Sequence, residues 1–355
     1  MISAESKTAA EDSAALPKTN TTEQVSVVIP CFNEERFIGK ALEGLAGQYD
    51  NEHYEILVVD GLSLDGTRDV IAEFAKTRPQ LAIKVVDNPR RSIPAALNLG
   101  VRHASSEIIA RMDAHAAPSE GYIRGCVEAL KQTNVGVVGM PCRVRPGENK
   151  LMARAIAGAV SHPFGIGDAK YRLALGTSPQ EAVDTVAFAC FKKSLWRELG
   201  GFNEELLANE DYDFNYRVRA SGYQVLLDRS GHCDYFARTT LRDLARQYGR
   251  YGRWKAEMVK LHPRSIKVRH VVAPLFLLSI IVLFVAGFFW PPALGGLALE
   301  MVLYLGMGLA SGWRISRMNS GGLVMLLLMP LVFFTIHVTW GTSFLSGMIR
   351  SQRKS

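Results

Sequence analysis

Asp113 and His115 lie two residues apart at the end of a short apolar segment, 108–112. This segment is rich in β-branched residues and predicts a buried strand, and Pro118 marks its exit. Side chains at i and i+2 of extended backbone point to the same side, so we expect the carboxylate and the imidazole to converge on one ion. One oxygen and one nitrogen ligand suit Mn²⁺ or Mg²⁺ shared with a substrate diphosphate better than a closed zinc site. Asp and His are also ordinary turn formers, so this pair alone does not identify a metal site.

Alternating strand and helix patterns surround this pair. Apolar strand patterns occur at 25–30, 54–60, 83–86 and 108–112, and helical spacing of apolar residues separates them. This alternation predicts an α/β fold with a mostly parallel sheet, which binds ligands at the carboxyl ends of its strands. Asp60 ends one strand and Asp113 ends another. We therefore expect both carboxylates at the same edge of the sheet.

The charge and the apolar residues of the chain point to a membrane. The chain has 355 residues, a net charge of +7 and 48% hydrophobic residues, which predicts one large domain plus an apolar region. A strongly basic stretch, 238–269, directly precedes that region. Basic residues beside a hydrophobic segment are typical of the cytoplasmic side of a membrane, not of nucleic-acid binding. The five cysteines are scattered without paired spacing, which predicts neither disulfides nor a zinc site and fits a reducing compartment.

Three apolar runs close the chain, at 271–289, 293–310 and 322–341. Each approaches the ~20 residues of a transmembrane helix, so we expect three spans. Arg314 and Arg317 agree with a cytoplasmic loop between the second and third runs, whereas three spans would place Arg350, Arg353 and Lys354 outside. Glu300 is also costly in hydrocarbon. One run could therefore be re-entrant or interfacial.

These observations divide the chain into five parts. We expect a disordered tail at 1–24 without a signal peptide, and a catalytic domain at 25–237. A basic interfacial region at 238–270, transmembrane helices at 271–345 and a basic tail at 346–355 follow.

The motifs of the domain, taken in order, resemble those of the family 2 glycosyltransferases. They are Val27-Val28-Ile29-Pro30-Cys31-Phe32-Asn33-Glu34, Val58-Val59-Asp60-Gly61-Leu62-Ser63-Leu64-Asp65-Gly66-Thr67, Asp113-Ala114-His115, Gly200-Gly201-Phe202-Asn203-Glu204 and Glu210-Asp211-Tyr212-Asp213. Within that family the chain is most similar to succinoglycan-type exopolysaccharide glucosyltransferases. The resemblance implies a GT-A (Rossmann-like) nucleotide-sugar-binding domain. Two positions depart from the usual motifs, because Gly61 and His115 stand where many relatives have Asp.

The resemblance also implies roles for individual residues. Pro30, Asn33, Glu34, Asp60 and Asp113 would bind the nucleotide sugar, although strand-end and helix-cap polarity explains most of them equally well. Asp113 and His115 would bind the divalent cation, Mn²⁺ or Mg²⁺, that stabilises the leaving diphosphate.

The acidic pair Glu210-Asp211 resembles the pair of which the Asp is the catalytic base, and direct attack by the acceptor would invert the anomeric centre. The alternative is an acidic first turn of a helix, and both can hold at once. Asp213 and Arg217 would only support the site.

The segment Arg250-Tyr251-Gly252-Arg253-Trp254 resembles the Gln-x-x-Arg-Trp element of processive polysaccharide synthases, with Arg in place of Gln. Arg250, Arg253 and Trp254, together with Glu210, would then contact the acceptor or a diphosphate. The alternative is an amphipathic interfacial helix with its arginines on lipid headgroups and an apolar face toward lipid, formed by Leu241, Leu244, Tyr248, Tyr251 and Trp254.

The resemblance implies an inverting glycosyltransferase of a bacterial inner membrane, with several spans and a cytoplasmic catalytic domain. It would transfer a hexose, glucose from UDP-glucose, to a polyprenyl-diphosphate-linked saccharide during exopolysaccharide synthesis. A processive polysaccharide synthase and a non-catalytic, membrane-tethered nucleotide-sugar-binding protein are the alternatives. No nucleic-acid partner is expected.

Overall fold

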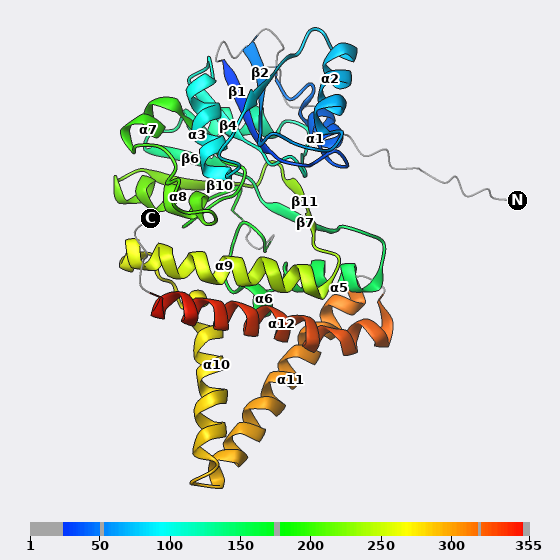
Figure 1. The fold of residues 1–355 in the computed structure, drawn as a ribbon, viewed down its shortest axis with the longest axis vertical. Helices are drawn as coiled ribbons and strands as arrows, with labels where there is room; N and C mark the ends of the chain where they lie inside the picture. Colours follow the sequence, from blue (N-terminus) through cyan, green and yellow to red (C-terminus); the bar gives the residue numbers. More distant parts are fainter. Residues whose placement is uncertain (1–23, 50–52, 174–177, 319–320, 351–355) are drawn as a thin grey trace, which may run out of the picture.

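A computed structural model of the chain describes residues 24–49, 53–173, 178–318 and 321–350. The tail expected at 1–24 lies outside the described residues except for Gln24, as do Arg353 and Lys354 of the basic tail. From top to bottom, Figure 1 shows a sheet domain, a pair of helices side by side, and a helical hairpin that projects away from them.

The main sheet has eight strands in the order β3-β2-β1-β4-β9-β6-β10-β8. The first four in this order are parallel, with β3 at Ala82–Asp87, β2 at Tyr54–Asp60, β1 at Val25–Cys31 and β4 at Ile108–Arg111. They are connected by α1 (Ile38–Leu45), α2 (Thr67–Thr77) and α3 (Ile93–His103). The predicted α/β alternation and mostly parallel sheet are confirmed for this half.

The other half of the sheet is mixed. Strand β9 (Cys190–Lys192) runs antiparallel between β4 and β6 (Val135–Gly139), β10 (Gln224–Asp228) is parallel to β6, and β8 (Gln180–Ala182) is antiparallel to β10. A second sheet has the order β5-β11-β7, with β5 at Ala116–Pro118, β11 at Cys233–Ala237 and β7 at Cys142–Pro146. Helices α4 (Tyr122–Leu130), α7 (Lys193–Glu198) and α8 (Glu210–Ala220) complete the domain.

Two apolar cores lie on opposite faces of the main sheet. In β1, Val27 and Ile29 belong to one core and Val28 to the other, as the two-residue period of a strand requires. All five cysteines are buried and free.

Helices α9 (Leu241–Leu261) and α12 (Gly322–Ile349) lie side by side beneath the sheet domain, as Figure 1 shows. Their contacts advance together along both chains, because Gly252 lies near Trp340, Ala256 near Gly347, and Lys260 donates to the Arg350 carbonyl oxygen. The two helices therefore run in the same direction. A Cβ atom at Gly252 would lie 2.5 Å from the Trp340 carbonyl oxygen, so this approach requires a glycine. Helices α5 (Leu151–Ala159) and α6 (Pro163–Ile166) also pack against α12.

Helices α10 (Val268–Ala286) and α11 (Pro292–Met318) form the projecting hairpin, and the short helix η2 (Pro263–Ser265) joins α9 to it. In the described residues, α10, α11 and α12 are long and apolar enough to cross a membrane. Helix α12, however, lies across the hairpin in Figure 1. Within the hairpin, the Ser279 hydroxyl donates a hydrogen bond of 2.5 Å to Glu300, which gives this acidic side chain a polar partner.

Candidate active site

The carboxylate of Asp60 at the end of β2 is buried and hydrogen-bonded within the protein. It accepts hydrogen bonds from the Ser63 backbone N–H (3.0 Å), the Ser63 hydroxyl (2.5 Å) and Arg68 Nε (2.6 Å). Arg68 also bonds Asp87 at the end of β3 at 2.6 Å. Asp60 therefore orders the loop after β2 and is rigidly held at the carboxyl edge, where the sequence predicts it.

The loop after β1 is hydrogen-bonded to the loop after β2. Asn33, at φ 54°, donates its backbone N–H to the Ser63 hydroxyl and accepts a bond from the Leu64 N–H, each at 2.8 Å. The backbone N–H of Glu34 donates to the Thr67 hydroxyl at 2.8 Å, and Pro30 lies in β1 opposite Val59.

Gly61 follows Asp60, and a Cβ there would lie 3.1 Å from the Phe32 ring.

Asp113 and His115 lie in a turn, not in a strand. Strand β4 ends at Arg111, and the Ala116 N–H donates to the Asp113 carbonyl oxygen at 3.1 Å before β5 joins the second sheet. The expectation of extended backbone through these residues was wrong, because the chain must change direction here to pass from one sheet to the other. Both side chains nevertheless line the same cavity.

His115 is held by Glu34. Its Nδ1 atom lies 3.2 Å from Glu34 Oε1. Burial disfavours the charged imidazole, but the hydrogen bond to Glu34 and the nearby Asp113 raise the pKa of His115 above its ordinary value. This arrangement leaves Nε2 as the atom that could bind a metal, and a carboxylate behind a histidine ligand is a common way to orient it.

The described residues contain no cluster of three or more His, Cys, Asp or Glu side chains that could hold a metal ion. Asp113 and His115 therefore fit an ion that takes its remaining ligands from substrate oxygens and water, as Mn²⁺ and Mg²⁺ commonly do.

Glu210 and Asp211 begin α8 beside Arg111. Arg111 lies 3.0 Å from Glu210 and 3.4 Å from Asp113, so one guanidinium joins the metal-side and helix-side carboxylates. Burial raises the pKa of Glu210 to about 7, although Arg111 opposes this shift. Asp211 is less buried, lines the cavity, and accepts a bond of 2.7 Å from the Tyr212 backbone N–H. Both acids line the cavity, and Asp211 is the more accessible of the two.

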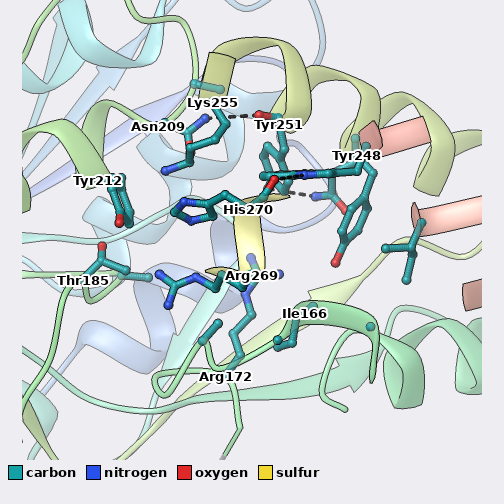
Figure 2. Close-up of a pocket in the computed structure, with 18 of the residues that line it drawn as sticks. Ile166, Arg172, Thr185, Asn209, Tyr212, Tyr248, Tyr251, Lys255, Arg269 and His270 are labelled. Atoms are coloured by element: carbon teal, nitrogen blue, oxygen red, sulfur yellow. Dashed lines mark hydrogen bonds between the residues drawn. The ribbon is translucent and has the colours of Figure 1, made fainter. Parts of the chain in front are cut away.

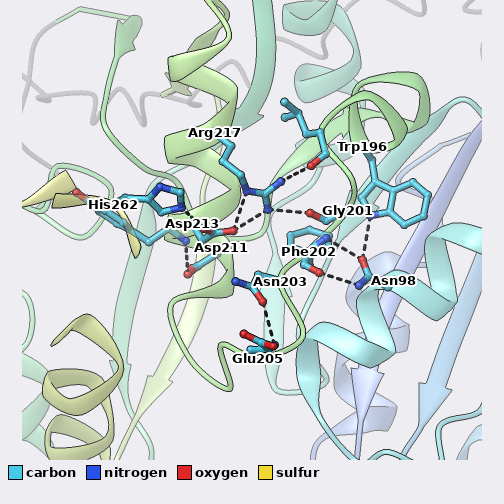
Figure 3. A network of polar contacts seen from close by, with 12 residues as sticks. Asn98, Trp196, Gly201, Phe202, Asn203, Glu205, Asp211, Asp213, Arg217 and His262 are labelled. Carbon is cyan, nitrogen blue, oxygen red and sulfur yellow. Dashed lines mark hydrogen bonds and ion pairs between the residues drawn. The ribbon is translucent and has the colours of Figure 1, made fainter. Parts of the chain in front are cut away.

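A buried polar network fixes the start of α8, as Figure 3 shows. Asp213 is only 1% exposed and bonds Arg217 Nε and His262 Nε2, each at 2.9 Å. Arg217 also donates to the carbonyl oxygens of Leu199 and Gly201, each at 2.7 Å. Asp213 and Arg217 thus lie where a supporting role requires them, inside the protein and away from the cavity.

A single cavity of about 600 Å³ joins the carboxylates to the apolar helices. Asp113, Glu210 and Asp211 line it on the sheet side, and Figure 2 shows part of its wall. On the helix side it is lined by residues of α10, α11 and α12, namely Val272, Ala273, Phe276, Tyr304, Met307, Ile336 and Trp340. The same helices also contribute Arg269, His270 and His337 to the lining, so the helix side is mainly apolar but carries three polar side chains.

Helix α9 presents one face to this cavity. Gln247, Tyr248, Tyr251 and Lys255 line it at roughly i, i+4 spacing, together with Arg250. Arg253 is exposed and does not line the cavity, which fits its position about half a turn from Tyr251 and Lys255.

The remaining members of the Gln-x-x-Arg-Trp-like stretch and its flank face protein. Trp254 packs against Leu206 and Tyr212. The interfacial-helix hypothesis expected Leu244 and Tyr248 to face lipid. Both side chains are instead buried among residues of α5 and α12.

Of the six cations that line the cavity, the sequence analysis named only Arg250 as a site residue, and the environments of two others, Lys255 and Arg172, are unusual. Lys255 is 2% exposed, with Nζ 3.2 Å from the centre of the Tyr212 ring. Arg172, in the loop after α6, lies over the rings of Tyr171 and Tyr235 at 5.5 and 5.4 Å. Lys255 occupies the buried stripe of an otherwise basic amphipathic helix, and that position is the sequence signal that could have identified it. Nothing in the sequence around Arg172 singles it out.

Comparison with known proteins identifies the domain. The model for "Glycosyl transferase family 2" matches residues 26–200. A Methanococcus voltae protein, dolichyl N-acetyl-alpha-D-glucosaminyl phosphate 3-beta-D-2,3-diacetamido-2,3-dideoxy-beta-D-glucuronosyltransferase, is 27% identical over 66% of this chain and 74% of its own length. Succinoglycan biosynthesis protein ExoA of Rhizobium meliloti is 28% identical over 66% of this chain and 70% of its own.

Among solved structures, the mannosyltransferase PcManGT from Pyrobaculum calidifontis, in complex with GDP-Man and Mn²⁺, has a similar fold. Its TM-score is 0.61 at 21% identity, over 94% of this chain and 89% of that chain. The similarity extends through the helical region as well as the sheet domain.

Proposed function

Since this chain is a glycosyltransferase of family 2 with a GT-A fold, we propose that it transfers one hexose from a nucleotide sugar to a lipid-linked saccharide. The donor is a UDP-sugar, with UDP-glucose as the first candidate, and the acceptor is a polyprenyl-diphosphate-linked saccharide of a bacterial cell-surface polysaccharide. Two relatives support this class of acceptor, because one name contains a dolichyl phosphate sugar and the other contains succinoglycan biosynthesis.

The cavity is the observation that carries this proposal. It connects Asp113 and Asp211 directly to Phe276, Tyr304 and Trp340 of the apolar helices. A soluble acceptor would not need an apolar wall, whereas a lipid-linked sugar has one polar and one apolar end. The cavity therefore matches an acceptor that remains in the membrane during the reaction.

The chemistry assigned to the residues follows from their positions. Asp211 accepts the proton of the acceptor hydroxyl, which attacks the anomeric carbon opposite the leaving diphosphate and inverts it. Arg111 holds Glu210 and Asp113 in place on either side of this reaction. Asp113 and His115 would hold a divalent cation, which supplies charge stabilisation to the diphosphate when bound.

The membrane arrangement is part of the proposal. Helix α12 packs along α9, which carries Arg246, Arg250, Arg253 and other charged residues through its length. If α12 crossed the membrane, α9 would have to enter the hydrocarbon with it, at a large desolvation cost for each charge. We therefore favour two spans, α10 and α11, with α12 lying in the plane of the cytoplasmic interface. This arrangement also places Arg350 on the cytoplasmic side, where basic residues are favoured.

A donor screen tests the proposed activity. The purified full chain is incubated with a panel of UDP- and GDP-sugars, Mn²⁺ and a bacterial lipid extract, and the products are analysed by mass spectrometry. We expect one lipid to gain the mass of a single hexose. A ladder of products would identify a processive synthase, and donor consumption without any glycolipid would contradict a lipid-linked acceptor.

Reporter fusions test the topology. Fusions after Pro292 should be external, and fusions after Ala310 and Arg350 cytoplasmic. An external reporter after Arg350 would support three spans instead.

A further inference from the structure

Among the cavity cations in the described residues that form no ion pair, Lys255 and Arg172 are shielded from solvent, whereas Arg238 and Arg250 are exposed. Arg111 faces Glu210 and Asp113, and Arg269 pairs with Asp184 and, at 2.7 Å, with Asp168. Within the described part of the chain, no carboxylate lies within ion-pair distance of Lys255 or Arg172. The cavity as a whole is lined by six Arg or Lys side chains and three Asp or Glu side chains. It is therefore suited to an anionic ligand.

Lys255 is the more unusual of the two. Its side chain is 2% exposed, and Nζ has no hydrogen-bond partner among the described residues. An ammonium group that leaves water without a partner destabilises the folded state, and the Tyr212 ring at 3.2 Å compensates only in part. Burial accordingly lowers the pKa of Lys255 to about 7. An anion that entered the cavity would supply the missing counter-charge.

The position of these cations indicates which class of anionic ligand the cavity suits. Figure 2 shows Lys255 and Arg172 on the cavity wall, with Tyr251 one helical turn before Lys255. Asp211, on the sheet side, is close enough to influence the charge of Lys255, while the apolar helices line the other side. A lipid-linked sugar has the same order of groups, because its phosphate lies between the sugar and the hydrocarbon chain.

We propose that Lys255 and Arg172 bind the phosphate or diphosphate of the acceptor lipid, with its polyprenyl chain against α10–α12 and its sugar beside Asp211. This inference rests on the proposed function, and it assigns the acceptor phosphate to residues separate from Asp113 and His115, which serve the donor. Arg172 supplies a fork of N–H donors and Lys255 a buried point charge, a combination suited to phosphate oxygens.

Binding of a short polyprenyl phosphate tests this site directly. The affinity of the full chain in detergent is measured for farnesyl phosphate and for farnesol, which differ only in the phosphate. We expect the wild type to prefer farnesyl phosphate. Lys255→Gln and Arg172→Gln should each reduce that preference by roughly 10- to 100-fold, the usual effect of losing one charge-assisted hydrogen bond.

Arg246→Gln is the matched control, because Arg246 is an exposed cation of the same helix that faces away from the cavity. It should retain the full preference. A Lys255→Gln protein that folds normally and keeps the preference would overturn the proposal. Weakened UDP binding in Lys255→Gln with unchanged farnesyl phosphate binding would also overturn it, since the cation would then serve the donor.

Competition separates lipid phosphate from free phosphate. Millimolar inorganic phosphate should displace farnesyl phosphate only weakly, because it gains nothing from the apolar wall. Equal binding of inorganic phosphate and farnesyl phosphate would overturn the assignment to a lipid. If no lipid-linked saccharide accepts sugar but the Lys255-dependent preference persists, the proposed function fails and the phosphate site stands.

Discussion

The strand edge and the helix side of the cavity differ in whether their charged side chains have partners within the protein. At the strand edge, Asp60 is bonded to Ser63 and Arg68, and Glu34 to His115, before any ligand arrives. On the helix side, Lys255 is buried without a partner. The strand edge is therefore preorganised by the protein itself, whereas the helix side requires an anion to complete it. Substitutions on the two sides should therefore have different consequences.

Removal of the divalent cation should abolish transfer. Under the proposed function, Asp113 and His115 would bind the ion, and the leaving diphosphate would depend on it for charge stabilisation. Transfer is measured in excess EDTA and after addition of Mn²⁺, and Mn²⁺ binding is measured separately by electron paramagnetic resonance. His115→Ala should lose the bound ion, while His115→Asp should retain it with a preference for harder ions. Full activity in EDTA would show that the strand edge works without a metal.

Asp211→Asn should lower the transfer rate by about 10²–10⁴-fold, because an amide cannot accept the proton of the acceptor hydroxyl. UDP affinity should barely change, since the strand edge is intact. Glu210→Gln is the comparison variant, and it should lose less because Glu210 is already paired with Arg111 at 3.0 Å. Weak UDP binding with near-normal turnover in Asp211→Asn would move this residue to the donor side.

Glu34→Gln should weaken metal affinity by roughly 10- to 100-fold, as is typical when the partner of a histidine ligand changes. The contact of 3.2 Å between Glu34 and His115 is the reason. Titration with Mn²⁺ measures the effect, and saturating Mn²⁺ should restore most of the transfer rate. If saturating Mn²⁺ restored nothing, Glu34 would have to contact the substrate itself.

Gly252→Ala should destabilise the protein by about 1–3 kcal/mol, because overpacked positions typically cost this much. The new methyl group would meet the Trp340 carbonyl oxygen at 2.5 Å, between α9 and α12. Gly249→Ala, one turn earlier, would meet only the Ser343 hydroxyl at 3.3 Å and should be neutral or slightly stabilising. Thermal unfolding in detergent compares the two. Equal Tm values would mean that α9 and α12 are not closely packed in the membrane-bound protein.

Lys255→Met should raise the Tm of the ligand-free protein by a few degrees at pH 6, in a buffer without phosphate. The pKa of Lys255 is lowered to about 7 in the folded protein, so the unfolded chain holds this proton more readily than the folded protein does. The buried charge therefore costs most below about pH 7, and the cost declines as the pH rises toward the ordinary lysine pKa. The gain in Tm should be smaller at pH 9. No gain at pH 6 would mean that Lys255 has a partner in the protein.

Sequence reasoning could bring Asn33, Asp60 and Asp113 to one edge of the sheet, because each lies at or just after the carboxyl end of a parallel strand. Strand order alone therefore determines their approximate position. The geometry at His115 was less predictable, since the turn there depends on a second sheet whose partner strand, β11, comes more than a hundred residues later.

On the helix side, the Gln-x-x-Arg-Trp similarity drew attention to Arg253 and Trp254, whereas helical geometry turns Tyr251 and Lys255 toward the cavity. The orientation of α12 was likewise hidden, because length and composition are the same for a helix that crosses a membrane and for one that lies on it.

The buried, unpaired state of all five native cysteines has a practical consequence for work on this protein. A thiol that is buried reacts slowly with maleimides and other alkylating reagents, and burial further suppresses the thiolate, as the raised pKa of Cys126 and Cys233 indicates. The wild-type chain should therefore react very little with thiol-directed labels under native conditions. A single cysteine introduced at an exposed position, such as Phe289 in the hairpin turn, can carry a spin label or a fluorophore without first removing the native thiols.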